Sequence, residues 1–405
     1  MGTIQSKIET LLKIPQIIQL KTIFSTEIDN FYLVGGAVRN ALLNIPIKDV
    51  DFATSYTPDE LIALCKRKKI THIPTGLQYG TITIIIKNTA YEITSLREDI
   101  KTDGRHAVVT YTKDLKLDSK RRDFTFNALY IDFNGKLYDF HHGQSDLSKK
   151  QLKFIGNSNN RIKEDYLRIL RLFRFYAELE GLSIDKNSLT AAINAKHHLN
   201  QLSAERIRQE FIRILSGKNY YNAIKLLAKY QICHEFVFLS DQLIKAISLY
   251  QKNNIFPPKH EILIAYAIMQ EQEPQQELHR LKKRLQLSNK ETSIIKAIIS
   301  YHNNLPALLL SPIEIKKLLF LHGRDKLLIL YYYQIFISSH NIANYHAIIS
   351  QIKHLQIPKF PISGKHLIAE GIPEGEIIGK KLALLQKKWL DSNLSLSKRE
   401  LLNSL

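Results

Sequence analysis

Residues 31–54 read FYLVGGAVRNALLNIPIKDVDFAT, and this stretch decides the fold of the N-terminal part of the chain. The apolar run Tyr32–Gly35 predicts a strand that ends in a Gly-Gly turn. Ala37–Leu43 predicts a short helix, and Asp49–Ala53 predicts a second strand. Glycines let the backbone approach a phosphate closely, and a helix N-terminus presents amides to an anion. The stretch therefore favours a phosphate-binding turn.

Two carboxylates stand one residue apart in the second predicted strand. Side chains at i and i+2 on a strand point to the same face, so Asp49 and Asp51 should lie side by side, with Val50 turned toward a core. Adjacent carboxylates repel each other and are retained mainly around a cation. Mg²⁺ usually takes one or two carboxylates plus substrate phosphates. The hypothesis is a metal-dependent nucleotidyl-transfer site, to which Glu92 on a neighbouring strand could add a third carboxylate.

Charge and composition point to a polyanionic partner. Among 405 residues, Lys and Arg number 57 against 38 Asp and Glu, a formal net charge of +19. In an enzyme-sized chain this excess favours nucleic acid over a merely solvated surface. The longest apolar run, 327–337, is interrupted by Gln334 and is shorter than the ~20 residues of a membrane span. Two distant cysteines, Cys65 and Cys233, favour a reducing compartment, and we expect a cytoplasmic protein without a zinc site.

The hydrophobic pattern changes once along the chain. Residues 1–30 predict one or two lead-in helices, and 31–155 predict a mixed sheet with helices. Residues 97–109 are polar and predict a mobile loop. From 156 to 405, apolar positions recur at helical spacing, so this part is expected to be all-helical.

Arginines recur every three residues after 164, in EDYLRILRLFRF. Arg168, Arg171 and Arg174 drift around a helix, because three residues fall short of one turn. Asp165 and Arg168 can meet side by side. From spacing alone the favoured interpretation is a solvated helix whose Glu164–Arg168 pair contributes about 0.2–0.5 kcal/mol.

An Asp/Arg pair also has a specific chemical use. Cytosine and adenine both present an exocyclic amino donor beside a ring-nitrogen acceptor, whereas uracil and guanine present the reverse order. A carboxylate can accept from the amino group while a guanidinium donates to the ring nitrogen. Such a pair selects C and A and refuses U and G without a template, because wrong bases leave polar groups unpaired.

Two further motifs are basic. Arg122, in RRDFTFNAL, could clamp a triphosphate with a bidentate contact, or could form an ion pair at a helix start. In SAERIRQE (203–210), Ser203 is a helix N-cap candidate, and structural bracing is the favoured role.

The ordered motifs resemble the class II tRNA nucleotidyltransferase and bacterial poly(A) polymerase family, and most of all its CCA-adding enzymes. They cover about half the chain, from Leu33 to Glu210. The motifs are LVGGAVRN, DVDFAT, YEITSLRED, DGRH, RRDFTFNAL, EDYLRILRLFRF and SAERIRQE. The segment 362–389 also resembles a C-terminal stretch of some bacterial members.

The resemblance implies an α+β fold: a polymerase-β-like head (1–155) with a mixed sheet and helices, a helical neck (156–235), and a helical body and tail (236–405). Asp49 and Asp51 would hold two Mg²⁺ ions, and Asp165 with Arg168 would read the base. Matching nucleotide-binding positions are Gly36, Arg39, Arg122, Asp165, Arg168, Arg171 and Arg174. The chain departs from the family at Asn40, where aspartate is usual. We expect altered hydrogen bonding there and an intact metal site.

The resemblance further implies template-independent addition of C, C and A to the 3′ end of tRNA from CTP and ATP. The partners would be tRNA and the two nucleotides, without a membrane, and the protein would be a monomer or homodimer. The alternatives are a poly(A) polymerase, an enzyme that adds only A or only CC, and a non-catalytic RNA-binding protein. Residues 97–109 resemble the loop that complete addition needs, which argues against addition of CC alone.

Overall fold

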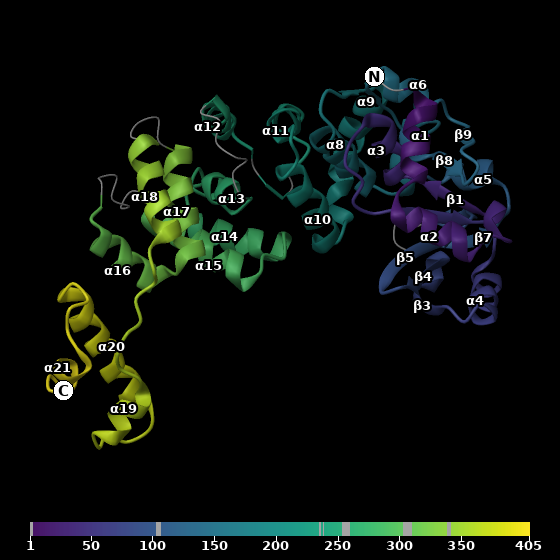
Figure 1. The fold of residues 1–405 in the computed structure, drawn as a ribbon. Coiled ribbons are helices and arrows are strands. Elements are labelled where there is room, and N and C mark those ends of the chain that lie inside the picture. The colour runs from purple at the N-terminus through teal and green to yellow at the C-terminus, as the bar shows by residue number, and fades with distance from the viewer. Residues whose placement is uncertain are drawn as a thin grey trace. The chain divides into compact units, whose positions relative to one another are not determined.

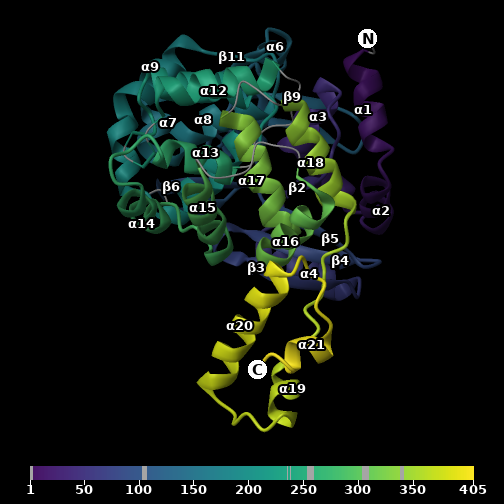
Figure 2. The ribbon, with the colours of Figure 1, turned by 90° about the vertical axis from the view of Figure 1, so that its left-hand side faces the viewer.

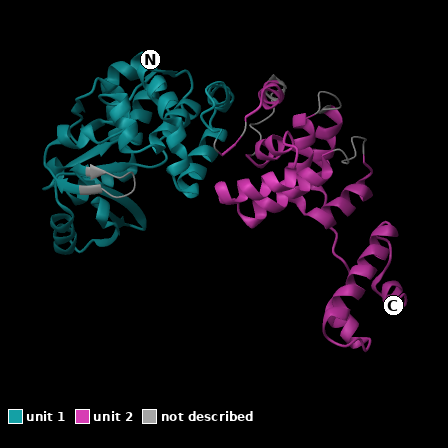
Figure 3. Cartoon of the chain, turned by 180° about the vertical axis from the view of Figure 1, so that it is seen from behind, with its two compact units in different colours: residues 1–235 teal, residues 236–405 magenta. Residues whose placement is uncertain are grey.

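The computed structural model describes residues 3–102, 107–234, 236–237, 239–252, 260–302, 310–337 and 342–405. The chain divides into two compact units, Met1–Glu235 and Phe236–Leu405, which Figure 3 draws in different colours. Each unit is described by itself.

The first unit is built on a seven-stranded sheet with the strand order β3-β4-β5-β2-β1-β8-β9. The pairing of β2 with β5 is parallel and the other pairings are antiparallel, so the sheet is mixed, as predicted. The strands are β1 (Phe31–Val34), β2 (Asp51–Thr54), β3 (Thr71–Gly76), β4 (Thr81–Ile86), β5 (Thr89–Ser95), β8 (Leu129–Asp132) and β9 (Leu137–Asp139).

Helices precede, connect and follow these strands (Figure 1). One or two lead-in helices were predicted, and two are present. Helix α3 packs on β1 and β8, while α4 packs on β3 and β4. The helices up to the neck are α1 (Ile4–Leu12), α2 (Pro15–Ile23), α3 (Gly36–Leu43), α4 (Pro58–Arg67), α5 (Leu115–Lys120) and α6 (Gly143–Ser148), with short 3₁₀ turns at Ile28–Asn30, Leu77–Tyr79 and Thr125–Asn127.

The strand predicted over Asp49–Ala53 begins later than expected. It spans Asp51–Thr54, so Asp49 lies in the segment before it, and Val50 is only half-buried. The reason is the length of its neighbour, because Val34, the last residue of β1, pairs with Asp51. Residues before Asp51 therefore have no partner strand on the β1 side, and the face-sharing argument for the two aspartates was wrong in its premise.

The loop prediction for 97–109 was also wrong over most of its length. β6 (Arg97–Thr102) pairs antiparallel with β7 (Ala107–Tyr111), which makes a separate hairpin. The run AVVTY has the β-branched and aromatic side chains that favour strands, whereas its polar partner strand concealed the pairing. The DGRH motif at 103–106 lies outside the described residues.

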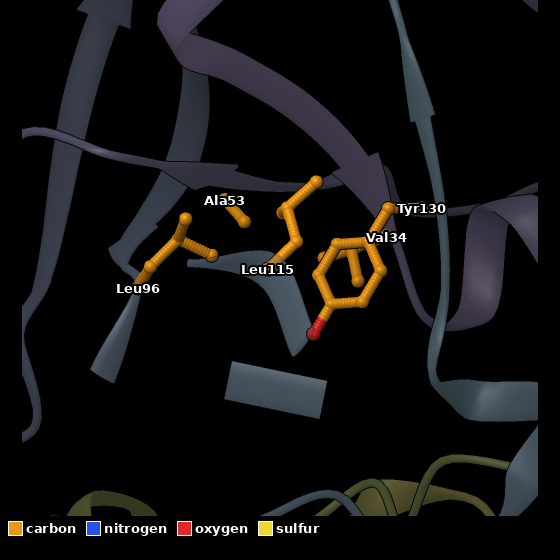
Figure 4. Close-up of a cluster of buried hydrophobic side chains, with 5 residues drawn as sticks. All are labelled: Val34, Ala53, Leu96, Leu115 and Tyr130. Atoms are coloured by element: carbon orange, nitrogen blue, oxygen red, sulfur yellow. The ribbon is translucent and has the colours of Figure 1, made fainter. Parts of the chain in front are cut away.

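One small core joins the sheet to α5. The buried cluster consists of Val34, Ala53, Leu96, Leu115 and Tyr130, which come from β1, β2, the position directly after β5, α5 and β8 (Figure 4). Burial of such side chains stabilises the fold by about 25 cal/mol per Å² of apolar surface. The cluster therefore fixes α5 against the strands that carry the turn and Asp51.

The neck helices follow the sheet within the first unit. They are α7 (Ser158–Glu164), α8 (Leu167–Glu178), α9 (Lys186–Ala195), a 3₁₀ segment at Lys196–Gln201, α10 (Ala204–Leu215) and α11 (Tyr220–Lys229). One exception to the all-helical prediction is β11 (Ser183–Ile184), which pairs with β10 (Gln151–Leu152). A Cβ on Gly217 would lie 2.6 Å from the carbonyl carbon of Ala177, so only glycine permits this close approach of α10's end to α8.

The second unit is helical throughout its described part. Its elements are α12 (Asp241–Lys252), α13 (His260–Ile268), α14 (Pro274–Arg284), α15 (Asn289–Tyr301), α16 (Pro312–His322), α17 (Arg324–Ile337), α18 (Ile342–His354), α19 (Gly364–Ala369), α20 (Glu376–Asp391) and α21 (Lys398–Leu402). Figure 2 shows α19–α21 grouped together, around a small core that includes Leu367, Leu385 and Trp389. Among the described residues, no helix combines the length and apolar character that crossing a membrane requires.

Candidate active site

One open cavity of about 950 Å³ in the first unit brings most of the predicted site residues together. Among the described residues that line it, nine arginines and one lysine face six acids, so its surface is basic. Of the predicted residues, those on its wall are Gly36, Arg39, Asp49, Asp51, Arg122, Asp165, Arg168, Arg171 and Arg174. Glu92 is not among them. Residues as distant in the chain as Gly36 and Arg174 thus share one site.

The glycine turn lies between the phosphate-binding and metal-binding candidates. Gly35 precedes α3 with φ of +68°, a conformation that favours glycine. A Cβ placed on it would lie 3.8 Å from Nη1 of Arg122 and 4.0 Å from Oδ2 of Asp51. The backbone of the turn therefore approaches both a cationic and an anionic side chain.

The acidic part of the site fits a divalent cation. Asp51 is accessible through the open cavity, yet the surrounding protein raises its pKa, and the negative charges of Glu92 and Asp49 raise it further against Arg122 and Arg39. A concentration of negative charge of this kind is relieved by a cation with hard oxygen ligands. No cluster of three or more metal-ligating side chains occurs in the part of the chain that the structure describes. The fit is to a cation held by two carboxylates and completed by substrate oxygens.

Glu92 lies next to this acidic pair without reaching the cavity wall. In the parallel pairing of β2 and β5, Phe52 is opposite Ile93. Asp51 directly precedes Phe52 in β2, and Glu92 directly precedes Ile93 in β5. The Glu92 side chain is exposed. Its charge acts on Asp51, and its contact with a metal stays a prediction.

Arg122 is held from the protein side by two partners. Its Nε donates to the Tyr130 hydroxyl at 2.9 Å, and its Nη2 donates to Asp118 Oδ2 at 3.2 Å. Burial alone disfavours the guanidinium charge, but Tyr130 and Asp118 hold the pKa of Arg122 above its usual value. The arginine is therefore charged and oriented before any ligand arrives.

Arg39 has neutral amides as its direct partners. Its Nη1 donates to Asn127 Oδ1 at 2.8 Å, and its Nε and Nη2 donate to Asn40 Oδ1 at 3.1 and 2.8 Å. Burial lowers the pKa of Arg39 to about 10, which still leaves it charged at neutral pH. Asn40 also donates from Nδ2 to the carbonyl of Pro46 at 3.3 Å, a bond that an ionised aspartate could not make.

The three arginines of α8 reach the same cavity in spite of their drift around the helix. Arg171 pairs with the buried Asp123 through Nε at 2.8 Å and through Nη2. The Nε of Arg174 lies 3.0 Å from Oε2 of Glu210, which is also buried. Buried carboxylates therefore hold the second and third arginines.

The candidate base-reading residues are held by other groups. Asp165 lies between α7 and α8, where its Oδ1 accepts from the Leu167 N–H at 3.0 Å and its Oδ2 accepts from Arg206 at 2.7 Å. Arg168 donates to Glu164 Oε2 at 2.5 Å and to the Arg161 carbonyl at 2.8 Å. Both side chains face the cavity, and a carboxylate with two bound donors retains lone pairs for a base.

Sequence reasoning missed the buried partners of these arginines. Arg206 and Glu210 belong to the motif for which structural bracing was the favoured role, and the residues that they contact, Asp165 and Arg174, lie on the cavity wall. Asp123 and Asn127 were quoted within RRDFTFNAL without a role. Asp118 lay outside every motif, and only its spacing of three and four residues from Arg121 and Arg122 could have indicated it.

Comparisons with known proteins relate this chain to one group of enzymes. Residues 31–153 match the family model described as the poly(A) polymerase head domain, and residues 181–240 match the one described as the probable RNA and SrmB-binding site of polymerase A. The chain is 32% identical over 396 residues to the mitochondrial CCA tRNA nucleotidyltransferase 1 of Mus musculus, covering 95% of this chain and 88% of that protein.

Bacterial relatives are similar too. The chain is 35% identical over 277 residues to the CCA-adding enzyme of Oceanobacillus iheyensis, covering 67% of each chain. Its fold is similar to the crystal structure of the Bacillus stearothermophilus CCA-adding enzyme in complex with CTP, with a TM-score of 0.75, 25% identity and 94% coverage of both chains.

The Asp123–Arg171 pair predicts acid sensitivity of the first unit. Burial alone would raise the pKa of Asp123, but Arg171 and hydrogen bonds hold it well below its usual value. A carboxylate whose pKa is depressed in the folded state stabilises the protein at any pH above its unfolded-state pKa of about 3.9. This stabilisation is lost progressively as the pH falls from that value toward the lower folded-state pKa. We expect Asp123→Asn to be less stable than wild type by about 3–5 kcal/mol at pH 7 and this difference to narrow below pH 4. Urea unfolding from pH 7 to pH 3 measures it, and a constant difference would contradict the assignment.

Proposed function

We propose that this chain, which belongs to the tRNA nucleotidyltransferase and poly(A) polymerase family, adds C, C and A to the 3′ end of tRNA from CTP and ATP and releases pyrophosphate. The observation that carries the proposal is the single cavity that joins the Gly35 turn, the two aspartates, Arg122 and the Asp165/Arg168 pair. Nucleotidyl transfer needs a phosphate cradle, a cation site and a base selector within reach of one nucleotide. The CCA-adding enzymes named above are similar to this chain over most of its length.

The phosphates of the nucleotide would bind at the end of the cavity near the glycine turn. The Gly35 turn and Nη1 of Arg122 lie close together on this part of the cavity wall, and backbone N–H groups at a helix N-terminus bind phosphate. Guanidinium groups bind phosphate oxygens bidentately and stay charged. Arg171 and Arg174, which line the same cavity, supply further positive charge.

Asp49 and Asp51 would hold Mg²⁺, and Glu92 is proposed as an adjacent third carboxylate that acts through Asp51. When bound, two such ions lower the barrier by activating the attacking 3′-hydroxyl and stabilising the leaving pyrophosphate oxygens. The chain itself orients the α-phosphate toward the hydroxyl by fixing the β- and γ-phosphates. Carboxylates, water and phosphate oxygens are the ligands that Mg²⁺ prefers.

Base choice would fall to Asp165 and Arg168. Asp165 would accept a hydrogen bond from the exocyclic amino group of C or A, while Arg168 would donate to the adjacent ring nitrogen. Arg206 and the Leu167 N–H each donate to the Asp165 carboxylate and hold it in place, and a carboxylate can only accept hydrogen bonds. Uracil and guanine would face the carboxylate with a carbonyl oxygen and leave polar groups unpaired.

A basic groove in the second unit supports an RNA partner. A hollow of about 530 Å³ is lined by residues of α14, α15, α16 and α17, among them Lys282, Lys296 and Lys326. Lys282 and Lys326 donate to the neutral Asn289 and Ser293 side chains. Their positive charges are therefore available to phosphodiesters. We propose that tRNA backbone phosphates lie along this groove.

The cytoplasm is the proposed compartment. Both cysteines, Cys65 and Cys233, are buried free thiols of the first unit, which is consistent with a reducing compartment. Some relatives carry mitochondrial names, and the mitochondrial matrix is reducing as well. Localisation of the tagged protein distinguishes the two.

Incorporation of single labelled nucleotides tests the function. With tRNA lacking CCA, CA or A, the wild-type protein should add two C, then one A, and stop. Indefinite A tailing would favour a poly(A) polymerase, and A-only or CC-only products would favour a partial enzyme. Asp49→Ala should lower the rate at least about a hundredfold because it removes a metal ligand. Asp59→Ala changes an exposed acid on α4 and should leave the rate unchanged. RNA binding without incorporation would favour a binding protein.

Substitution of Asp165 tests base selection. We expect Asp165→Ala to reduce discrimination of C and A against U and G by about 10- to 100-fold, since one selecting hydrogen bond is lost. The readout is kcat/KM for all four nucleotides. The Mg²⁺ concentration for half-maximal rate should stay within about twofold of wild type, because Asp165 is proposed to contact the base and not the metal. Unchanged discrimination would disprove the role of Asp165.

Charge removal in the groove tests RNA binding by the second unit. The double variant Lys296→Gln/Lys326→Gln should reduce the slope of log Kd against log salt for tRNA by about 1–2, because each lost phosphate contact contributes about 0.7–0.9. The matched control Lys13→Gln/Lys66→Gln removes two exposed lysines from the first unit. Equal slopes for wild type and the groove variant, or an equal effect of the control, would remove the groove from the tRNA interface.

A further inference from the structure

We propose that Asp118 is a positioning residue that holds Arg122 in the orientation required to bind the phosphates of the incoming nucleotide. The inference rests on the proposed function, since it deepens the role of the same cavity. Asp118 does not line the cavity and acts only through the arginines beside it.

The Asp118 carboxylate is fully buried and receives donors on both oxygens. Oδ1 accepts from the Arg97 backbone N–H at 3.1 Å and from Arg121 Nε at 2.8 Å. Oδ2 accepts from Arg122 Nε at 3.3 Å and Nη2 at 3.2 Å, and from the Tyr130 hydroxyl at 2.6 Å. One buried anion thus gathers two guanidinium groups, a phenol and the first residue of β6.

Tyr130 completes the hold on Arg122 from a rigid position. Its hydroxyl donates to Asp118 and accepts from Arg122 Nε at 2.9 Å, which closes a three-residue ring of hydrogen bonds. The tyrosine ring is packed into the cluster of Figure 4 together with Leu115, which lies on the same helix as Asp118. Both partners of Arg122 are therefore anchored in one core.

This anchoring directs the remaining edge of Arg122 toward the site. Nε and Nη2 face Asp118 and Tyr130, whereas Nη1 lies near the Gly35 turn. One carboxylate between two guanidinium groups leaves a net positive charge for an anion. Because a long side chain loses rotamer freedom on binding, an arginine that is already fixed binds phosphate at a smaller entropic cost.

The segment that carries Arg121 and Arg122 also contacts α7 and α8, the two helices on either side of Asp165. The carbonyl of Arg121 accepts from Arg168 Nη2, and the carbonyl of Arg122 accepts from Arg161 Nη1, both at 3.2 Å. The end of α5 therefore lies between the phosphate-binding arginine and the arginine proposed to read the base. Asp118 therefore fixes the side chains of Arg121 and Arg122, while the backbone carbonyls of these two residues bind arginines of the neck.

Nucleotide binding without RNA tests the proposal. The measurement is equilibrium dialysis of full-length protein with CTP and with ATP in the presence of Mg²⁺. Asp118→Asn keeps the shape and removes the charge, and it should raise both Kd values about tenfold, or about 1.4 kcal/mol, by the same factor because the phosphates are common to both nucleotides. Tyr130→Phe removes one of the two partners and should raise both about threefold. The matched control Asp114→Asn changes the exposed N-cap of α5 and should leave both Kd values unchanged.

The split between affinity and stoichiometry separates positioning from folding. A merely structural role would lower the number of nucleotides bound per chain at an unchanged Kd, and that result would overturn the proposal. An equal rise in Kd for Asp114→Asn would overturn it as well. If Asp118→Asn does not fold, a wild-type Kd in Tyr130→Phe decides against positioning. Failure of the wild type to add CCA, with normal nucleotide binding, would instead overturn the proposed function alone.

Discussion

The structure of the first unit depends on keeping many guanidinium groups close together around one cavity. Like charges at this density repel, and burial of an unpaired charge is costly. The chain solves this with buried carboxylates placed behind the arginines: Asp118 serves Arg121 and Arg122, Asp123 serves Arg171, and Glu210 serves Arg174. Each carboxylate offsets the repulsion and also fixes a direction, so the charges that remain face the ligand.

These carboxylates come from parts of the chain that are distant in sequence. Asp118 and Asp123 flank the end of α5 beside the sheet, whereas Glu210 lies on α10 of the neck. The two ends of the proposed nucleotide site, phosphate and base, are therefore joined by ion pairs as well as by apolar packing. Truncating one partner at such a site leaves a buried charge uncompensated, which is why we expect effects on both stability and binding.

Much of the fold could be predicted because its signals are local. The hairpin of β4 and β5, the capped start of α4 and the lead-in helices follow from β-branched runs and from Thr57-Pro58 at a helix start. The failures have a common cause. Asp49 lies outside β2 because β1 ends at Val34. The polar run 97–102 is a strand because it pairs with the apolar run 107–111, and Ser183 is in a strand because Gln151 lies beside it. Strand limits depend on partners, which spacing along one segment does not contain.

The sequence by itself determined the motifs: the glycine turn, the aspartate pair, Arg122 and the Asp165/Arg168 pair, together with the family that their order resembles. These are recognisable because each needs particular residue types at short, fixed spacing. Only the tertiary structure decided which groups hold them. The roles of these supporting side chains depend on their direction and burial. Arg206 contacts Asp165, Asn40 and Asn127 contact Arg39, and Asp118 and Tyr130 contact Arg122. The physical reason is that a hydrogen bond or ion pair is specified by geometry within about 3 Å, which arises only when separate elements pack.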